Sequence, residues 1–210
     1  MDRGKIKAKA KELIKGKILI IFALTLILTA VGGLSGVIPP VGPILILLIA
    51  GSISISQAFI FLGIAKKNRK PEVKDLLEGF KGDNFMRGFE GYIRYTVFTF
   101  LWSLLFVIPG IIKSIEYSQM FYLMAENPKM SAGEAQKKSM ELMEGHRWEY
   151  FIWNLSFLPW MILTGITFGI ASIYVAPYMS TTFALYYRGL VEKESPIEKV
   201  KEAVKNVISK

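Results

Sequence analysis

Three long stretches of this 210-residue chain contain no Asp, Glu, Lys, Arg or His: residues 18–65, 95–112 and 151–187. Their lengths are 48, 18 and 37 residues. A helix needs about 20 mostly apolar residues to cross the hydrocarbon core of a bilayer, and uncharged runs of about 18 or more are candidates for such spans. The core helices of soluble proteins carry only an apolar stripe. This charge distribution therefore excludes an ordinary water-soluble domain and predicts a membrane protein.

Helix-breaking residues divide the two longest stretches. Residues 32–43 contain four glycines and three prolines, the residues that interrupt helices most strongly. This segment predicts two helices, over about residues 18–37 and 44–65, joined by an uncharged turn. Gly165 and Gly169 divide the last stretch in the same way. They predict helices over about residues 148–166 and 170–188.

The middle of the chain allows two interpretations. Residues 95–112 could form one span, which makes five in all. However, Pro109 and Gly110 interrupt this stretch, and residues 111–125 beyond them stay largely apolar apart from Lys113 and Glu116. A second hairpin, with helices over about residues 92–108 and 110–126, makes six spans.

The distribution of basic residues favours six spans. Of the 26 Lys and Arg residues, 7 precede the first span, 8 lie within residues 66–94, 4 within 129–147 and 6 within 188–210. Loops on the cytoplasmic side of membrane proteins carry an excess of Lys and Arg. Six spans place 25 of the 26 on one side, with Lys113 the exception, whereas five spans divide them 15 to 11.

The sequence thus predicts an all-α, polytopic transmembrane helical bundle of six spans, arranged as three helical hairpins, in the cell membrane. Residues 1–190 would form a single integral membrane domain with both termini in the cytoplasm. Residues 191–210 would add a cytoplasmic amphipathic helix. The net charge of +9 comes from residues that flank the apolar runs. It therefore indicates anionic lipid headgroups, rather than nucleic acid, as the partner of the basic face.

Short amphipathic helices are predicted between the spans. Residues 3–17 place apolar side chains on one face and lysines around it, which is typical of a helix at a bilayer surface. Pro71 opens a second such segment. Ser131 and Glu134 form the pattern of a capping box, with Gly145 at the end of that helix. Ser195 repeats the capping pattern before the C-terminal segment.

The most polar predicted span is the fourth. Lys113 and Glu116 lie three residues apart, so they share a helix face and can form an ion pair. Charged residues within a membrane mark a polar pathway or binding site, or else a structural pair in the bundle interior. The binding candidates on this basis are intramembrane polar residues: Lys113, Glu116, Tyr117, Ser118, Gln119 and, from the fifth span, Asn154.

The residue types present argue against catalysis. The chain has no Cys and a single His, His146, so thiol chemistry and most metal sites are not expected. His146 has no nucleophile or paired carboxylate motif beside it, and no phosphate-binding, nucleotide-binding or metalloprotease motif occurs. We therefore expect no enzymatic activity, no catalytic residues, no metal and no cofactor.

Several short segments in the second half of the chain are similar in sequence, and occur in the same order, to segments of one family: Ile108-Pro109-Gly110-Ile111-Ile112-Lys113-Ser114, Tyr117-Ser118, Asn127-Pro128, Thr167-Phe168-Gly169-Ile170, Pro177-Tyr178 and Tyr186-Tyr187. They resemble domain-of-unknown-function 975, a family of bacterial integral membrane proteins. The resemblance implies a multi-pass bacterial membrane protein and supplies no activity. It also implies that Lys113 is a motif position, whereas Glu116 departs from the uncharged residue usual there.

Two functional hypotheses follow. The first is a non-enzymatic membrane module that assembles with, or modulates, another membrane component, which could be another membrane protein or a second copy of the chain. The second is a small transporter or channel subunit whose polar path follows the fourth span. The second hypothesis requires Lys113, Glu116, Gln119 and Asn154 to converge on one polar cavity.

Overall fold

The computed structural model describes the backbone of residues 2–36 and 41–208. Within these ranges the chain forms helices and no strands, which confirms the all-α prediction for the described residues. The helices in chain order are α1 (Arg3–Ile14), α2 (Ile18–Gly36), α3 (Val41–Lys67), the 3-10 helix η1 (Val73–Phe80), α4 (Asn84–Leu105), α5 (Val107–Glu116), α6 (Met120–Glu126), α7 (Ala132–Met143), α8 (Arg147–Leu155), α9 (Leu158–Ile166) and α10 (Ser172–Ile208).

Helices α2 and α3 form the first hairpin and correspond to the first two predicted spans. The predicted turn at residues 37–40 lies outside the described residues. Helix α3 crosses α4 at two glycines, since a Cβ atom on Gly51 would lie 1.7 Å from the carbonyl oxygen of Gly88. Small residues allow such close contact between helix backbones, which favours helix association in membranes.

Helices α4 and α5 form the second hairpin, which turns at Phe106. Helix α4 begins at Asn84, eight residues before the predicted start of the third span. The prediction of one continuous helix over residues 110–126 is wrong, because α5 ends at Glu116 and α6 begins only at Met120. At this break the carbonyl oxygen of Ile115 accepts hydrogen bonds from both the backbone N–H and the Oγ of Ser118.

Helices α8 and α9, followed by α10, form the third hairpin. The predicted fifth span is interrupted at residues 156–157, directly before Pro159, which has no N–H for a continuous helix. The prediction of a separate C-terminal helix with a cap at Ser195 is wrong, since α10 runs through that residue to Ile208. The side chains of residues 195–208 lie outside the described part of the structure.

The short helices agree better with the predictions from the sequence. Helix α1 buries Ala10 and Ile14 against the rest of the molecule. Ser131 caps α7 through the predicted capping box with Glu134, and Gly145 follows α7 with a φ of +74°. The segment after Pro71 is the 3-10 helix η1 rather than an α-helix.

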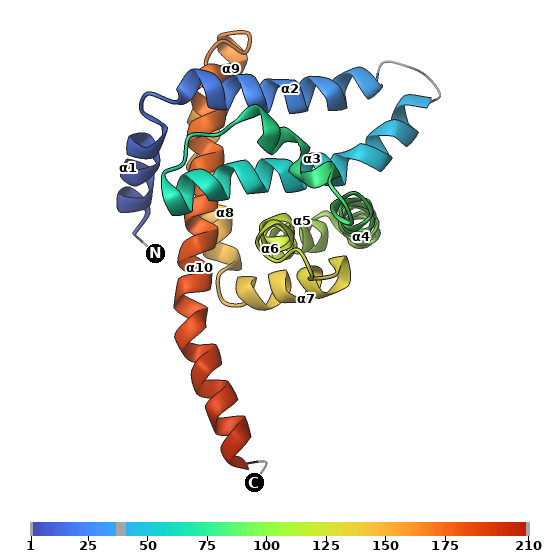
Figure 1. The fold of residues 1–210 in the computed structure, drawn as a ribbon, viewed down its shortest axis with the longest axis vertical. Helices are drawn as coiled ribbons and strands as arrows, with labels where there is room; N and C mark the ends of the chain where they lie inside the picture. The colour runs from blue at the N-terminus through green and yellow to red at the C-terminus, as the bar shows by residue number, and fades with distance from the viewer. Residues whose placement is uncertain (1, 37–40, 209–210) are drawn as a thin grey trace.

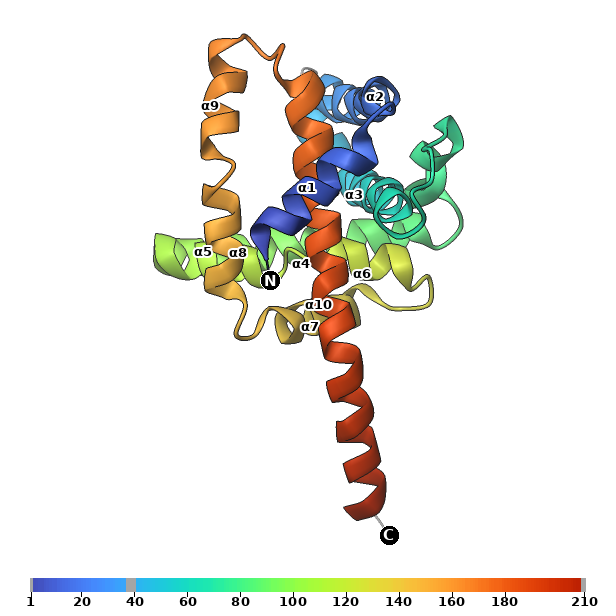
Figure 2. The ribbon, with the colours of Figure 1, turned by 90° about the vertical axis from the view of Figure 1, so that its left-hand side faces the viewer.

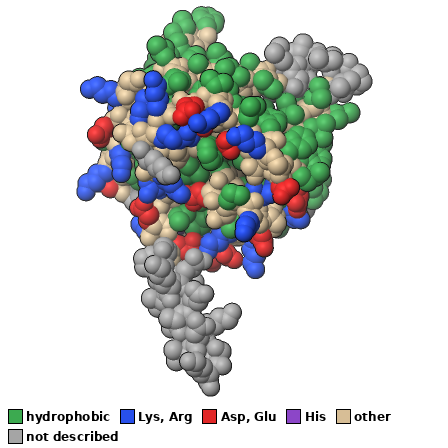
Figure 3. Space-filling view, in the orientation of Figure 1, with side chains coloured by type: hydrophobic (Ala, Val, Ile, Leu, Met, Phe, Trp, Pro, Cys, Tyr) green, Lys and Arg blue, Asp and Glu red, His purple; other side chains and the backbone are tan. Residues whose placement is uncertain are grey.

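The three hairpins run in three different directions. In Figure 1, α2 and α3 lie across the view, α4 and α6 are seen end-on, and α10 is vertical. Figure 2, turned by 90°, shows α2 and α3 nearly end-on and the α4–α5 hairpin across the view. Hydrophobic side chains cover the upper and right-hand parts of the surface in Figure 3, whereas charged side chains gather over the left-hand and lower parts.

One helix among the described residues, Gly42–Lys66 within α3, is long and apolar enough to cross a membrane. Its most apolar 18-residue window is only 44% buried, less than in a core helix of a soluble protein. Arg3–Ile14 and Ile18–Val31 pass the same test together but are bent by 93°. This is weak evidence for a membrane location, and it does not establish the six predicted spans.

Candidate functional site

The predicted ion pair on α5 is present and has a third member. Lys113 Nζ lies 2.7 Å from Glu116 Oε2, and Arg147 at the start of α8 lies 2.9 Å from Glu116 Oε1. Glu116 is only 2% exposed, so its carboxylate depends on these two cations. Lys113 Nζ also lies 5.2 Å from the ring centroid of Trp102. The cluster thus connects the second and third hairpins.

Helix α7 fixes the backbone beside this cluster. Ser139 Oγ donates to the carbonyl oxygen of Glu116 at 2.6 Å and accepts from the backbone N–H of Gln119 at 3.2 Å. Both groups lie at the break between α5 and α6, where helical bonds are missing. Ser139 therefore satisfies a donor and an acceptor that the break leaves free.

The other predicted site residues fall in two places. Ser118 and Asn154 line a cavity of about 330 Å³ between α5, α8 and α4, together with Tyr95, Ser114 and Tyr150. Tyr117 and Gln119 do not line this cavity. Tyr117 is buried with its ring 6.4 Å from that of Tyr95, and the Gln119 side chain donates to Ser118 Oγ at 2.6 Å.

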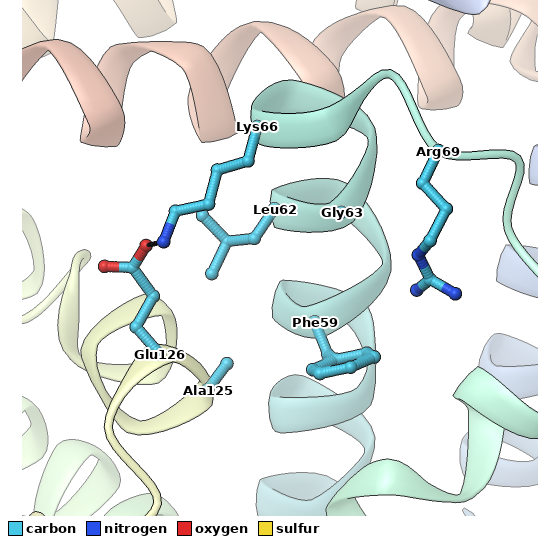
Figure 4. A pocket seen from close by; sticks show the side chains of 7 residues that line it. All are labelled: Phe59, Leu62, Gly63, Lys66, Arg69, Ala125 and Glu126. Carbon is cyan, nitrogen blue, oxygen red and sulfur yellow. Dashed lines mark ion pairs between the residues drawn. The ribbon is translucent and has the colours of Figure 1, made fainter.

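A second ionic cluster joins α6 to the first and third hairpins. Glu126 of α6 forms an ion pair with Lys66 of α3 and accepts a 2.5 Å hydrogen bond from Tyr187 of α10. In Figure 4 this pair borders a cavity of about 240 Å³, and Arg69 lies on the other side of α3. Arg69 pairs with Asp75 at 2.9 Å. Sequence reasoning missed this cluster, because no local pattern relates Glu126 to Tyr187, 61 residues away.

A third polar contact places α1 against the third hairpin. Lys7 Nζ donates to Ser156 Oγ at 2.7 Å and lies 4.4 Å from the ring centroid of Phe157. Burial lowers the pKa of Lys7, and the charges of Arg3 and Lys11 lower it further. The contact falls at the break between α8 and α9, where Ser156 and Phe157 leave the helix.

The described residues contain no group of three or more His, Asp and Glu side chains that could hold a metal ion. His146 Nδ1 lies 3.2 Å from Glu149 Oε2, within one turn of the start of α8. The arrangement therefore consists of ion pairs and hydrogen bonds that connect the hairpins, beside two cavities.

No curated protein and no solved structure matches the chain. The chain does match the family described as "Protein of unknown function (DUF975)", over residues 1–116 and 95–194. The two ranges overlap and together extend from residue 1 to residue 194, across all three hairpins. This confirms the resemblance noted in the sequence, and the description assigns no activity. The chain belongs to the DUF975 family.

Proposed function

We propose that this protein is a non-enzymatic module of the cell membrane, with both termini in the cytoplasm, that assembles with or modulates another membrane component. The exposed apolar surface at the hairpin ends supports the membrane location. It includes Leu104, Phe106 and Ile108 of the second hairpin and Ile166 and Phe168 of the third, all more than 70% exposed. Surfaces of this kind mark membrane or protein contacts.

The choice of a module over a transporter rests on Glu116, whose carboxylate is paired with two cations. Its two carboxylate oxygens are taken by Lys113 and Arg147, so the charged groups of α5 hold two hairpins together. Asn154 lines a different space, the cavity beside Ser118. The charged pair and Asn154 therefore do not meet at one polar cavity, as a polar path would require.

The alternative, a small transporter or channel subunit, is favoured by that cavity alone. Ser118, Asn154 and Ser114 offer hydroxyl and amide groups to a volume of about 330 Å³. A cavity of this size could hold a small polar solute. The two functions can be separated by reconstitution.

Membrane location and orientation are tested with the full chain. A fluorescent protein fused to either end should fluoresce in cells, and alkaline carbonate should leave the chain in the membrane fraction. A secreted phosphatase should be inactive at both ends. Activity of the phosphatase at either terminus, or release by carbonate, would contradict the proposal.

The choice between module and transporter is tested in liposomes that contain a pH-sensitive dye and the purified protein. We expect proton and potassium leak equal to that of protein-free liposomes. A leak that appears with the native protein and is lost in the variant Asn154→Leu would support the transporter instead. Phe168→Ala, a change in an exposed turn away from the cavity, is the matched control.

A further inference from the structure

We propose that the cavity between α4, α5 and α8 binds an uncharged lipid with a free hydroxyl group, of the diacylglycerol class. This inference rests on the membrane location proposed above and gives the proposed module a ligand. The cavity has a volume of about 330 Å³. Pockets for small molecules span about 300–1,000 Å³, so this one holds a glycerol headgroup and the first carbons of its chains rather than a whole lipid.

The wall of this cavity is polar but uncharged. Helix α5 contacts both α4 and α8, and Figure 2 shows α8 beside the α4–α5 hairpin. The lining residues are Tyr95, Ile111, Ser114, Ile115, Ser118, Tyr150, Phe151 and Asn154. Among the described residues, no charged side chain lines the cavity. The wall combines hydroxyl and amide groups with aliphatic and aromatic surface, which suits a molecule that is polar at one end only.

The basic residues next to the lining segments are paired with carboxylates. Lys113 of α5 and Arg147 of α8 both bind Glu116, at 2.7 and 2.9 Å. Arg94 of α4 binds Glu90 at 2.8 Å. Moving a charged group out of water is unfavourable unless an opposite charge receives it. A phosphate headgroup would find these cations occupied, so the cavity favours an uncharged headgroup.

Two serines of the wall are placed to accept a hydrogen bond from a ligand. Ser114 Oγ donates to the carbonyl oxygen of Ile111 at 2.8 Å. Ser118 Oγ donates in the same way to the carbonyl oxygen of Ile115 at 2.7 Å. A hydroxyl has one hydrogen and two lone pairs, so each serine offers the ligand a lone pair only. A matching ligand must therefore donate, which an alcohol can do and a fully esterified glycerol cannot.

The groups around Ser118 also include an acceptor without a donor. Gln119 Nε2 donates to Ser118 Oγ at 2.6 Å, whereas the buried Gln119 Oε1 has no hydrogen-bond partner in the described part of the structure. The Tyr150 hydroxyl lies near the side chains of Ser118, Asn154 and Gln119. Asn154 Nδ2 donates to the carbonyl oxygen of Tyr150 at 2.9 Å, which fixes the amide at the wall. An unpaired buried acceptor is unfavourable, so this surplus of acceptors agrees with a ligand that donates.

An apolar stripe on α5 leads from the cavity to the surface of the molecule. Ile115, Ile111 and Ile108 are spaced by four and three residues, so they share one face of the helix. Their exposed fractions rise from 9% to 44% and 71% toward the hairpin turn. An acyl chain can cover this stripe while its hydroxyl end lies at the serines, and burial of the stripe is favourable. A polyol from water would leave the stripe exposed, which makes the bilayer the source of the ligand.

Competition between lipids tests the ligand class with the full, unsubstituted chain. The protein is placed in phosphatidylcholine nanodiscs with a diacylglycerol that carries a photoreactive diazirine on its acyl chain close to the glycerol. Dioleoylglycerol, trioleoylglycerol and dioleoylphosphatidylglycerol are the competitors, of which the second has no hydroxyl group and the third is anionic. We expect mass spectrometry to locate the adducts on α5 or α8. Dioleoylglycerol should remove them at a concentration at least fivefold lower than either of the other two lipids.

Substitutions in the wall test the site. Ser114→Ala and Asn154→Leu should each weaken binding of the photoreactive lipid about fivefold, because each removes a hydrogen-bonding group. Ser172→Ala is the matched control and should bind as the native protein does. Ser172 Oγ also donates to a carbonyl oxygen three residues earlier, at 2.6 Å, but it does not line this cavity. The thermal midpoint in detergent is measured for each variant, so that loss of binding is separated from loss of the fold.

Equal competition by trioleoylglycerol or dioleoylphosphatidylglycerol would overturn the inference, since the free hydroxyl or the absence of charge would then not matter. Adducts confined to α2 and α3 would overturn it as well. Protection by glycerol without protection by dioleoylglycerol would assign the cavity to a solute from water and overturn the lipid. If the chain stays in the membrane after carbonate and no lipid competes, only the ligand is wrong. Release by carbonate would instead refute the proposed membrane location, and the ligand with it.

Discussion

Glu116 shows how the surroundings of a charged residue decide its role. A carboxylate with one lysine neighbour on the same helix is a common local pair, whereas a buried carboxylate between Lys113 and Arg147 connects two hairpins. Removing the partners of a buried charge is costly, but replacing the whole group by apolar side chains is often neutral. The cluster can therefore be tested by breaking it and by replacing it.

We expect the double variant Lys113→Met with Arg147→Met to lower the free energy of unfolding by about 3–5 kcal/mol, because Glu116 is left buried without a cation. Adding Glu116→Leu to the same variant should restore most of the loss. Denaturant unfolding in mild detergent measures both. Equal stability of the double and triple variants would show that Glu116 reaches water or another partner.

The sequence predicts part of this cluster and misses the rest for a physical reason. Lys113 and Glu116 are predicted as a pair because three residues on a helix bring side chains together. Arg147 lies on another helix, and only the packing of α8 against α5 brings it to Glu116. The pairing of Lys66 with Glu126 is missed for the same reason, since nothing local relates the two residues.

At the scale of elements, the crossing of α3 and α4 depends on the absence of side chains. We expect Gly51→Ala to destabilise the protein by about 1–3 kcal/mol or more, because its Cβ would lie 1.7 Å from the carbonyl oxygen of Gly88. Gly165→Ala in α9 is the matched control, since a Cβ there meets nothing within 4 Å. It should be neutral or stabilising by about 0.5–1 kcal/mol. Thermal unfolding in detergent compares them, and equal midpoints would contradict the close crossing.

The capping box of α7 should make stability depend on pH. Hydrogen bonds from the backbone and side chain of Ser131 lower the pKa of Glu134 below its ordinary value of 4.5. A pKa that is lower in the folded protein contributes stability above the ordinary value, and this contribution is lost as pH falls through the lowered value.

The difference in thermal midpoint between the native protein and Glu134→Ala should therefore be largest near neutral pH and shrink below about pH 4.5. In a Ser131→Ala background the pH-dependent part of the difference should become smaller but persist, because the hydroxyl bond is lost while the backbone N–H of residue 131 still donates to the Glu134 carboxylate. A constant difference at every pH would refute the role of this cap.

Sequence reasoning predicts the helices well where Gly and Pro punctuate uncharged residues, as at the facing ends of α2 and α3. It misses the break at residues 117–119, where no Gly or Pro lies, whereas Pro159 is a local signal for the break at residues 156–157. Side chains of other helices stabilise these breaks: Ser139 bonds the first and Lys7 bonds the second. Such contacts depend on the assembled fold and leave no local signal.

For the molecule as a whole, Glu126 of α6 connects the first hairpin with the third. We expect Glu126→Gln to lower stability by about 1–3 kcal/mol, because the ion pair with Lys66 is lost and the bond from Tyr187 is weakened. Hydrogen exchange should become faster near Lys66 and Tyr187, on two different hairpins. Glu192→Gln, which removes an exposed pair with Arg188, should change neither quantity. Faster exchange confined to α6 would contradict the connecting role.

The relative directions of the hairpins are beyond the reach of sequence reasoning. The charge pattern predicts that basic residues lie on one side, but hairpins that run in parallel or diverge satisfy that pattern equally. The divergence in Figures 1 and 2 depends on contacts between residues far apart in the chain, such as the glycine crossing and the two ionic clusters.

In the membrane location proposed above, the uncharged turns would also bear on how the chain is inserted during synthesis. A hairpin can enter the bilayer with both limbs together, and only its turn then leads. Since residues 106–112 and 165–171 carry no charge, neither of these turns takes an ionised group into hydrocarbon. Each such group would cost about 3 kcal/mol. The basic flanks remain with the ribosome side throughout. Each hairpin can thus be inserted as it emerges, independently of the hairpins that follow.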